Sequence, residues 1–314
     1  MISMRDRSLV SIADYSPDEL TVVLNTAVLL KQQPEQVRQL AAGKTLAMLF
    51  EKQSLRTRVT FEVAMTQMGG HAIYLQPADI GLGTREPVKD IARNLSRWCQ
   101  AIMARTFKHE TIVDLAQYAS IPVINALSDR EHPCQALADF LTLIEHKGGV
   151  KGRKMAFVGD GNNVAHSLML LAAKCGTHFS IACPAGYEPA ADIVAQATAI
   201  GAETGATIAV STDIAEMLNG ADVVYTDVWT SMGQEAEKAE RLRVFPPYQV
   251  NAQLLKYAKP DAIVMHCLPA HRGEEITEDV LEGPQSVVLD EAENRLHAQK
   301  AVLALALGWA PQIP

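Results

Sequence analysis

Short apolar runs that alternate with amphipathic stretches constrain the fold of this chain more than any other feature. A first series of runs predicts strands at 45–50, 72–75, 101–104 and 122–126. Helical patterns occur near 55–68, 87–98, 109–119 and 133–146. A second series of runs predicts strands at 155–159, 178–182, 206–210, 222–226, 262–265 and 287–289. Such alternation of strand and helix is typical of parallel α/β sheets.

The stretch "HKGGVKGRK" at 146–154 separates the two series, and its three glycines mark a domain boundary. The fold class that we expect is therefore α/β, with two open parallel-sheet α/β domains at 1–148 and 152–314. A last helix is predicted at about 291–307. Ligands of open α/β sheets bind beyond the carboxyl ends of the strands, so we expect the active site in the cleft between the domains.

Composition excludes several classes of protein. The 314 residues carry a formal net charge of −8 and no basic tail, which argues against nucleic acid as a partner. No apolar run reaches the ~18 residues of a membrane span, and "MISMRDRSLV" lacks the apolar core of a signal peptide. The five cysteines show no C-x-x-C spacing. We therefore expect a cytoplasmic protein with reduced thiols.

The stretch "SLRTR" at 54–58 follows the first predicted strand and opens a helix. Apolar residues at helical spacing, from Leu55 and Val59 to Met68, predict one wide buried face there. The first turn of a helix offers unpaired backbone N–H groups and a positive dipole end, and hydroxyl and guanidinium groups add further donors. A phosphate fits such a site, because an arginine fork matches its oxygens. A capped helix with two surface arginines is the alternative.

"EHPCQ" at 131–135 is a second signal after a predicted strand. Pro133 disfavours a helical conformation for His132 and suits the first position of a helix. His132 and Gln135 are then placed to donate to a carbonyl oxygen. The alternative is a histidine that only caps the helix.

"FVGDGNNVAHS" follows a predicted strand and resembles a dinucleotide-binding turn. The pattern is incomplete, because Val164 and Ala165 stand near the place of the third glycine, and no acidic residue clearly ends the next strand. A nucleotide-dependent oxidoreductase is therefore a minor alternative function.

"HCLPAHRGEEI" at 266–276 places a thiol at another predicted strand end. His266, Cys267 and His271 suggest zinc, but no second cluster with structural zinc spacing exists. An activated thiol or a polar substrate contact at Cys267 fits better, and a buried inert cysteine is the remaining alternative. We therefore expect no structural zinc site.

The motifs "SLRTR", "HPCQALADFLT", "FVGDGNNVAHS", "DVWTSMGQE", "HCLPAHRGEEI" and "ENRLHAQKA" together resemble the ornithine carbamoyltransferases over essentially the whole chain. The resemblance implies transfer of the carbamoyl group of carbamoyl phosphate to the side-chain amine of L-ornithine, giving citrulline and phosphate. It implies a carbamoyl-phosphate domain at 1–148, an ornithine domain at 152–314 and a last helix that packs back on the first domain. It also implies no metal and no organic cofactor, a homotrimer, and arginine biosynthesis rather than catabolism.

The same resemblance assigns site residues. For carbamoyl phosphate they are Ser54, Leu55, Arg56, Thr57, Arg105, His132, Pro133, Cys134, Gln135, Cys267, Leu268 and Arg295. For ornithine they are Asn163, Asp227, Ser231 and Met232. The catalytic groups are Arg105, His132, Cys267 and Asp227.

Two departures from the family pattern stand out. Leu55 occupies a position that is usually threonine or methionine, and Gly81 replaces a glutamine that in many members reaches a neighbouring subunit's site. Gly81 leaves a catalytically inactive homologue as an alternative function. Within the transferases, the alternative substrates are putrescine and a modified ornithine.

Overall fold

The computed structural model describes residues 2–82, 85–231 and 233–310. The chain forms two compact units. Unit 1 comprises Met1–Leu141 with Glu293–Pro314, and unit 2 comprises Thr142–Ala292. The division falls within two helices, α6 (Pro133–Lys147) and α12 (Val288–Ala306). Among the described helices, none is both long and apolar enough to cross a membrane.

Unit 1 is built on a four-stranded parallel sheet in the order β2-β1-β3-β4. The strands are β1 (Thr45–Phe50), β2 (His71–Leu75), β3 (Ala101–Arg105) and β4 (Val123–Leu127). The helices are α1 (Pro17–Gln32), α2 (Leu55–Gln67), α3 (Pro77–Ile80), α4 (Val88–Trp98) and α5 (His109–Tyr118), with the first part of α6 and the last part of α12.

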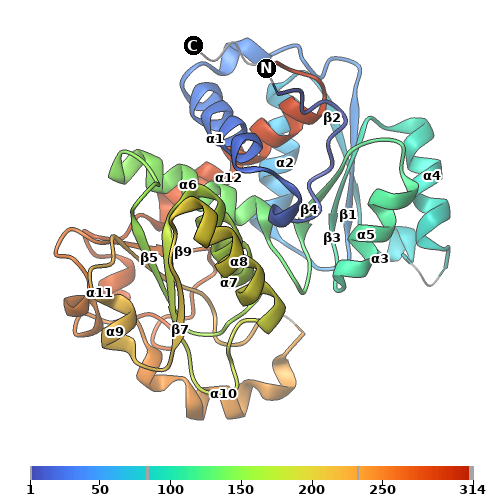
Figure 1. Cartoon of the computed structure of the whole chain (residues 1–314). Helices are drawn as coiled ribbons and strands as arrows, with labels where there is room; N and C mark the ends of the chain where they lie inside the picture. The colour runs from blue at the N-terminus through green and yellow to red at the C-terminus, as the bar shows by residue number, and fades with distance from the viewer. Residues whose placement is uncertain (1, 83–84, 232, 311–314) are drawn as a thin grey trace. The chain divides into compact units, whose positions relative to one another are not determined.

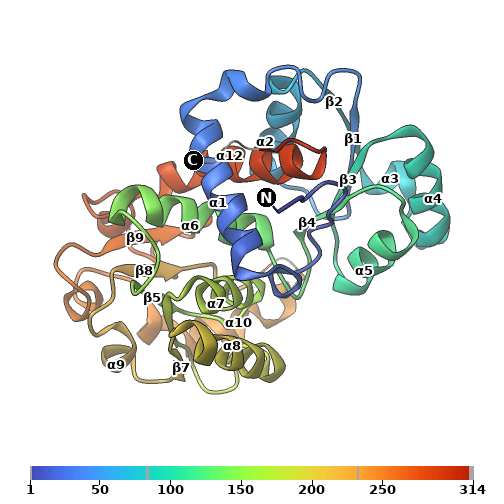
Figure 2. The ribbon, with the colours of Figure 1, turned by 45° about the horizontal axis from the view of Figure 1, so that its top comes forward.

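Helices cover both faces of this sheet (Figure 1). On one face α4 and α5 pack Ile91 and Ile112 into a buried cluster with β1, β3 and β4. The other face is covered by α2, whose Phe61 is fully buried. In unit 1 α12 lies beside α2 (Figures 1 and 2), and the Lys300 ammonium on α12 donates to the Gln67 amide oxygen on α2. Most of the last helix is therefore part of the layer architecture of unit 1.

Unit 2 is built on a five-stranded parallel sheet in the order β7-β6-β5-β8-β9. The strands are β5 (Lys154–Val158), β6 (His178–Ala182), β7 (Ile208–Ser211), β8 (Val223–Thr226) and β9 (Ile263–His266). The helices are α7 (Asn163–Cys175), α8 (Ala191–Thr204), α9 (Ile214–Leu218), α10 (Lys238–Val244) and α11 (Glu278–Leu281). Helices α7 and α8 cover one face, whereas α9 and α11 cover the other (Figure 1).

Both strand orders reverse at one point, and these points locate the crevices where open α/β sheets bind ligands. In unit 1 the order reverses between β1 and β3, so Arg105 at the end of β3 and the loop after Phe50 meet there. In unit 2 it reverses between β5 and β8, so the loops after Val158 and Thr226 meet there.

Two local predictions are wrong. Residues 287–289 form no strand: α12 begins at Val288, and only a single bridge joins Ser286 to Val264 of β9. The apolar face predicted for α2 is narrower than expected, because Leu55 is 75% exposed and Val59 is 46% exposed. Apolar spacing alone did not distinguish the buried second half of α2 from its open first turn.

Candidate active site

The first turn of α2 provides the donors that the sequence predicts for an anion. Ser54 is the N-cap, and its hydroxyl accepts the Thr57 backbone N–H at 3.3 Å, which fixes where the helix begins. The other N–H groups of a first helical turn have no partner within the helix. Since the Leu55 side chain is largely exposed, only its backbone N–H is suited to an anion, and that group does not depend on residue type.

A buried guanidinium connects this turn to two other helices of unit 1. Arg295 on α12 donates from Nη1 to the Gln135 amide oxygen at 2.6 Å and from Nη2 to the Thr57 hydroxyl at 3.1 Å. Gln135 in turn donates to Asp139 at 2.7 Å. Arg295 is 2% exposed and Thr57 is fully buried. Three sequence-predicted residues thus belong to one network, and Arg295 orients the other two.

His132 and Arg105 are buried members of the same region. Arg105 ends β3 and His132 directly precedes α6. Burial, then the charges of Arg295, Arg105 and Arg56, hold the pKa of His132 well below its ordinary value. The imidazole is therefore neutral at physiological pH, so it can donate one hydrogen bond to a carbonyl oxygen without adding a charge.

The next two predicted residues, Pro133 and Cys134, stabilise the beginning of α6. Pro133 occupies the first position of α6, where its lack of an N–H costs nothing. The Cys134 thiol donates to the Asn125 carbonyl at 3.4 Å, and burial raises its pKa to about 12. The Cys134 side chain thus anchors α6 to β4.

In unit 2 a single carboxylate gathers the candidate amine-binding groups. Asp227 follows β8, and its Oδ1 accepts the Cys267 thiol at 3.0 Å and the Val228 backbone N–H at 2.8 Å. Its Oδ2 accepts the Asn162 side-chain amide at 2.8 Å. Because a carboxylate only accepts, Cys267 is the donor here and carries its proton.

A second buried pair shapes the turn after Cys267. His266 donates from Nε2 to Glu275 at 2.9 Å and accepts the Leu268 backbone N–H on Nδ1 at 2.9 Å. These two bonds define the neutral tautomer with the proton on Nε2. Leu268 has φ +56°, a left-handed conformation that costs a non-glycine residue free energy. The His266–Glu275 pair therefore positions Cys267 and Leu268.

The loop after β8 holds Ser231, whose backbone N–H donates to Gln234 at 3.1 Å. Met232 lies outside the described residues. Arg241 on α10 anchors this loop by donating to the Trp229 carbonyl at 2.7 Å and pairing with Asp160 at 3.0 Å. Burial raises the pKa of Asp160 to about 6, although Arg241 opposes that shift.

Asn162, which the sequence reasoning passed over in favour of Asn163, is the asparagine that bonds Asp227. Asn163 is the first residue of α7, whereas Asn162 is its N-cap and accepts the Val164 and Ala165 N–H groups at 2.9 and 3.1 Å. The preference of asparagine for the N-cap was the available signal. Arg241 was also missed, because its partner Asp160 lies far away in sequence, and so was Glu275, although its partner His266 lies only nine positions away in the same motif.

The hydrogen bonds of Asn162 account for the stretch "GDGNN" without a bound dinucleotide. The Asn162 side chain already occupies two N–H groups of the first turn of α7, which a pyrophosphate would need. A Cβ on Gly161 would lie 2.2 Å from the Pro189 nitrogen, so glycine is required there by packing.

Asp227, His266 and Cys267 each present a possible metal-ligating atom, and these atoms lie within 4.8 Å of one another. Each of them is already hydrogen-bonded in the described structure: Asp227 to Asn162 and Cys267, and His266 to Glu275.

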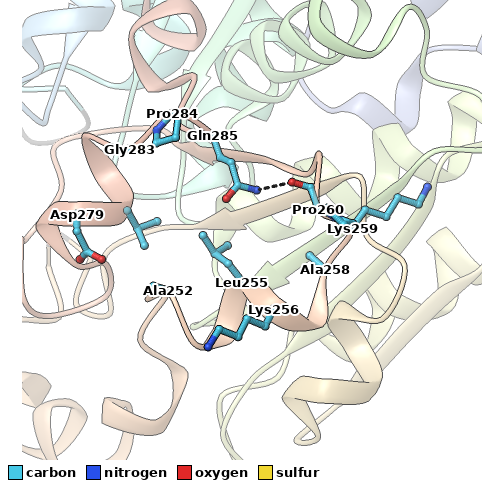
Figure 3. Close-up of a pocket in the computed structure, with 11 residues that line it drawn as sticks. Ala252, Leu255, Lys256, Ala258, Lys259, Pro260, Asp279, Gly283, Pro284 and Gln285 are labelled. Carbon is cyan, nitrogen blue, oxygen red and sulfur yellow. Dashed lines mark hydrogen bonds between the residues drawn. The ribbon is translucent and has the colours of Figure 1, made fainter.

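A cavity of about 500 Å³ lies elsewhere in unit 2 (Figure 3). Its lining precedes β9 or belongs to α11 and the turn after it: Ala252, Leu255, Lys256, Ala258, Lys259, Pro260, Asp279, Val280, Gly283, Pro284 and Gln285. Lys259 turns its ammonium away from the cavity (Figure 3) and donates to Asp222 at 2.8 Å. The cavity thus lies at the amino end of β9, opposite the strand ends that carry the candidate catalytic groups.

Two family models match the chain in succession. The Aspartate/ornithine carbamoyltransferase carbamoyl-P binding domain matches residues 7–145. The Aspartate/ornithine carbamoyltransferase Asp/Orn binding domain matches residues 151–306.

Similar whole proteins carry the same description. Ornithine carbamoyltransferase of Pyrococcus abyssi is 55% identical over 310 residues, which are 98% of each chain. The solved ornithine carbamoyltransferase of Pyrococcus furiosus has a TM-score of 0.95 and 53% identity, and the match covers 98% of this chain and 99% of that one. The anabolic ornithine carbamoyltransferase of Campylobacter jejuni has a TM-score of 0.89 and 40% identity, covering 94% and 97%.

Proposed function

The chain belongs to the aspartate/ornithine carbamoyltransferase family, and on that premise we propose how its residues perform the reaction. The protein transfers the carbamoyl group of carbamoyl phosphate to the side-chain amine of L-ornithine, giving L-citrulline and phosphate. The observation that carries the assignment of residues is the buried Arg295 fork, which joins Thr57 in the first turn of α2 to Gln135 on α6.

Unit 1 binds carbamoyl phosphate. The phosphate is bound by the first turn of α2, with the Ser54 and Thr57 hydroxyls and the Arg56 guanidinium as further donors. Negative charge grows on the carbonyl oxygen as the amine attacks. Arg105 and neutral His132 donate to that oxygen, and one such preorganised donor is typically worth ~3–4 kcal/mol of barrier. Because the groups are buried or hydrogen-bonded before substrate arrives, little reorganisation is needed.

Unit 2 binds ornithine through Asp227, Asn163, Ser231 and Met232. The attacking amine must first lose a proton: with a pKa of ~10.4, as for lysine, its neutral form costs about 4–5 kcal/mol at pH 7. The rate should therefore rise with pH until that proton is lost. Asp227 orients the amine or receives its proton. Because the two substrates react with each other, the residues that bind carbamoyl phosphate and those that bind ornithine must act in the same enzyme–substrate complex.

Cys267 acts as a hydrogen-bond donor that orients the amine-binding carboxylate. Its thiol already donates to Asp227, and this argues against a carbamoyl-thiol intermediate. The mechanism is then sequential, with carbamoyl phosphate first. The test is exchange of labelled phosphate into carbamoyl phosphate without ornithine. Exchange at a rate near turnover would show a carbamoyl-enzyme and refute this role, whereas Cys267→Ser should retain turnover with weaker ornithine binding.

We also propose a cytoplasmic homotrimer that acts in arginine biosynthesis. Support for biosynthesis comes from relatives named anabolic, in Pyrococcus furiosus and Campylobacter jejuni. Gly81 lines a cavity of about 180 Å³ with Phe50 and Glu51 and has no side chain to reach a neighbouring subunit. The expectation is weaker binding of carbamoyl phosphate than in relatives with glutamine, which Gly81→Gln should strengthen. Sedimentation equilibrium tests the trimer.

A colorimetric citrulline assay with ornithine, putrescine and acetylornithine tests the substrate. We expect ureido product only with ornithine. Comparable kcat/KM with putrescine would contradict the assignment of ornithine as the substrate.

A further inference from the structure

The segment that follows β9 contains a group of ligand-type side chains that the proposed reaction does not use. His271, Glu274 and Glu275 each offer one ligand atom, and these atoms lie within 4.8 Å of one another. His271 Nδ1 lies 3.7 Å from Glu274 Oε2 and 3.8 Å from Glu275 Oε2. The sequence alone grouped His271 with His266 and Cys267, but the structure gives it these two carboxylates instead.

The two oxygens of Glu275 have different environments. Oε1 accepts the His266 ring N–H at 2.9 Å and the His271 backbone N–H at 2.6 Å. Oε2 is buried and has no hydrogen-bond partner among the described residues, and the whole side chain is 0% exposed. A bare carboxylate oxygen in a buried position costs free energy unless a cation or donor meets it. Oε2 faces the imidazole, which together with Glu274 opens to solvent.

We propose that His271 Nδ1, Glu274 Oε2 and Glu275 Oε2 bind one divalent transition cation, for which Zn²⁺ is the natural probe. Imidazole and carboxylate are common ligands of Zn²⁺, at ~2.0–2.2 Å, so two ligands of a tetrahedral ion lie about 3.4 Å apart. The observed separations of 3.7 and 3.8 Å need to shorten by only a few tenths of an ångström. The fourth position is left to water.

The surroundings support this geometry. Gln249 donates from Nε2 to the Gly273 and Glu274 carbonyls at 2.9 and 3.0 Å, which fixes the backbone of the segment. Such bonds around a site hold the ligands in place. Lys238 pairs with the other oxygen of Glu274 at 3.6 Å, and this half-exposed pair is weak. The Arg272 charge is engaged by Glu278 and Glu282.

An ion at this site would join the exposed His271 to the buried Glu275. Through its other oxygen Glu275 holds His266, which orients the Leu268 turn. The ion would therefore fix the whole 266–276 segment, and it would raise the thermal stability of the protein by mass action.

The test is titration of the metal-stripped full chain with Zn²⁺ by calorimetry and with Co²⁺ by absorption spectroscopy. Site variants are His271→Ala and Glu274→Gln, which leave the buried Glu275 intact. The matched control is His146→Ala, which removes another partly exposed imidazole, 2.9 Å from the Asp290 carboxylate. Cys267→Ser tests for binding at the other cluster of ligand atoms, with Asp227 and His266.

We expect one bound ion, a Co²⁺ spectrum without thiolate charge transfer, and a Tm that rises with Zn²⁺. His271→Ala and Glu274→Gln should each weaken binding at least tenfold, whereas His146→Ala and Cys267→Ser should change it less than twofold. Binding that Cys267→Ser abolishes, or that His271→Ala leaves intact, would overturn the proposal. Absence of binding at millimolar Zn²⁺ would mean that His271 only forms ion pairs with the two glutamates, and would equally overturn it.

Discussion

Strand β8 carries a buried aspartate at each end, and this pair allows a controlled test of the amine-binding group. Asp227 follows the strand and is 7% exposed, whereas Asp222 precedes it and is 1% exposed. Asp222 accepts the Lys154 backbone N–H on Oδ2, and the Arg153 and Lys259 side chains on Oδ1. Both carboxylates are buried and each accepts three hydrogen bonds from the protein, but only Asp227 is assigned to ornithine.

Asp227→Asn cannot preserve the observed hydrogen bonds in either orientation of the new amide. An NH₂ group at the Oδ2 position would face the Asn162 amide, which cannot turn because its oxygen caps α7. At the Oδ1 position it would face the Val228 N–H and the Cys267 thiol. One buried donor is left unsatisfied and the remaining bonds lose charge assistance, so the free energy of unfolding should fall by about 2–4 kcal/mol.

Asp222→Asn can keep the Lys154 N–H bond on its amide oxygen, and its NH₂ group then faces the Arg153 and Lys259 side chains, which are 39% and 43% exposed and can turn to water; it should therefore destabilise the protein less than Asp227→Asn does. Only Asp227→Asn removes a charged contact to ornithine as well. Such a loss is worth about 2–4 kcal/mol, or roughly 30- to 1,000-fold in kcat/KM for ornithine. Urea unfolding and steady-state kinetics at saturating carbamoyl phosphate measure the two effects. If Asp222→Asn lowered kcat/KM for ornithine as much as Asp227→Asn does, the assignment of Asp227 would be wrong.

Three further predictions concern other groups. Arg56→Ala should reduce carbamoyl phosphate affinity and turnover together by orders of magnitude, whereas Arg58→Ala, which removes an exposed guanidinium, should leave both within about threefold in a citrulline assay. The folded protein holds His132 neutral, while the unfolded chain binds its proton below about pH 6.5, so stability should fall as pH falls below that value; His132→Gln should reduce this slope by one proton in urea unfolding. Arg241→Met should release the loop after β8, seen as faster amide hydrogen exchange there and a higher KM for ornithine. Acidification through the Asp160 pKa of about 6 removes one of the two charge partners of Arg241 and leaves Glu237, so the wild type should show a milder form of the same effect.

The sequence was sufficient for most of the fold because its signals are local. Ser16, Pro17 and Glu19 define the start of α1 within four residues, and both bonds of their capping box are present. Every predicted strand but one lies within two residues of an observed strand. The exception, 287–289, shows the limit of local signals: a short apolar run fits a strand or the buried first turn of a helix, and tertiary packing of α12 decides between them.

The sequence proposes the site as a set of residues, but it does not indicate the network that joins several of them. Its members follow strand ends, so topology alone indicates that they gather at the switch point of each sheet. What each member does depends on partners that are remote in sequence. Arg295 bonds Gln135 and Thr57 across 160 and 238 positions, and no local pattern encodes such distances.

The same reasoning explains why neighbours in one motif have different tasks. In "HCLPAHRGEEI" His266 turns inward to Glu275, Cys267 turns to Asp227, and His271 lies against two carboxylates of its own segment. A strand end exposes successive side chains to different surroundings, because the chain leaves the regular alternation of the sheet there. The two imidazoles are alike in sequence, but one is fully buried and hydrogen-bonded on both ring nitrogens, whereas the other is 45% exposed at the side chain. His266 therefore positions the turn at Leu268. Of the two imidazoles, only that of His271 has a ring nitrogen that an incoming cation can reach.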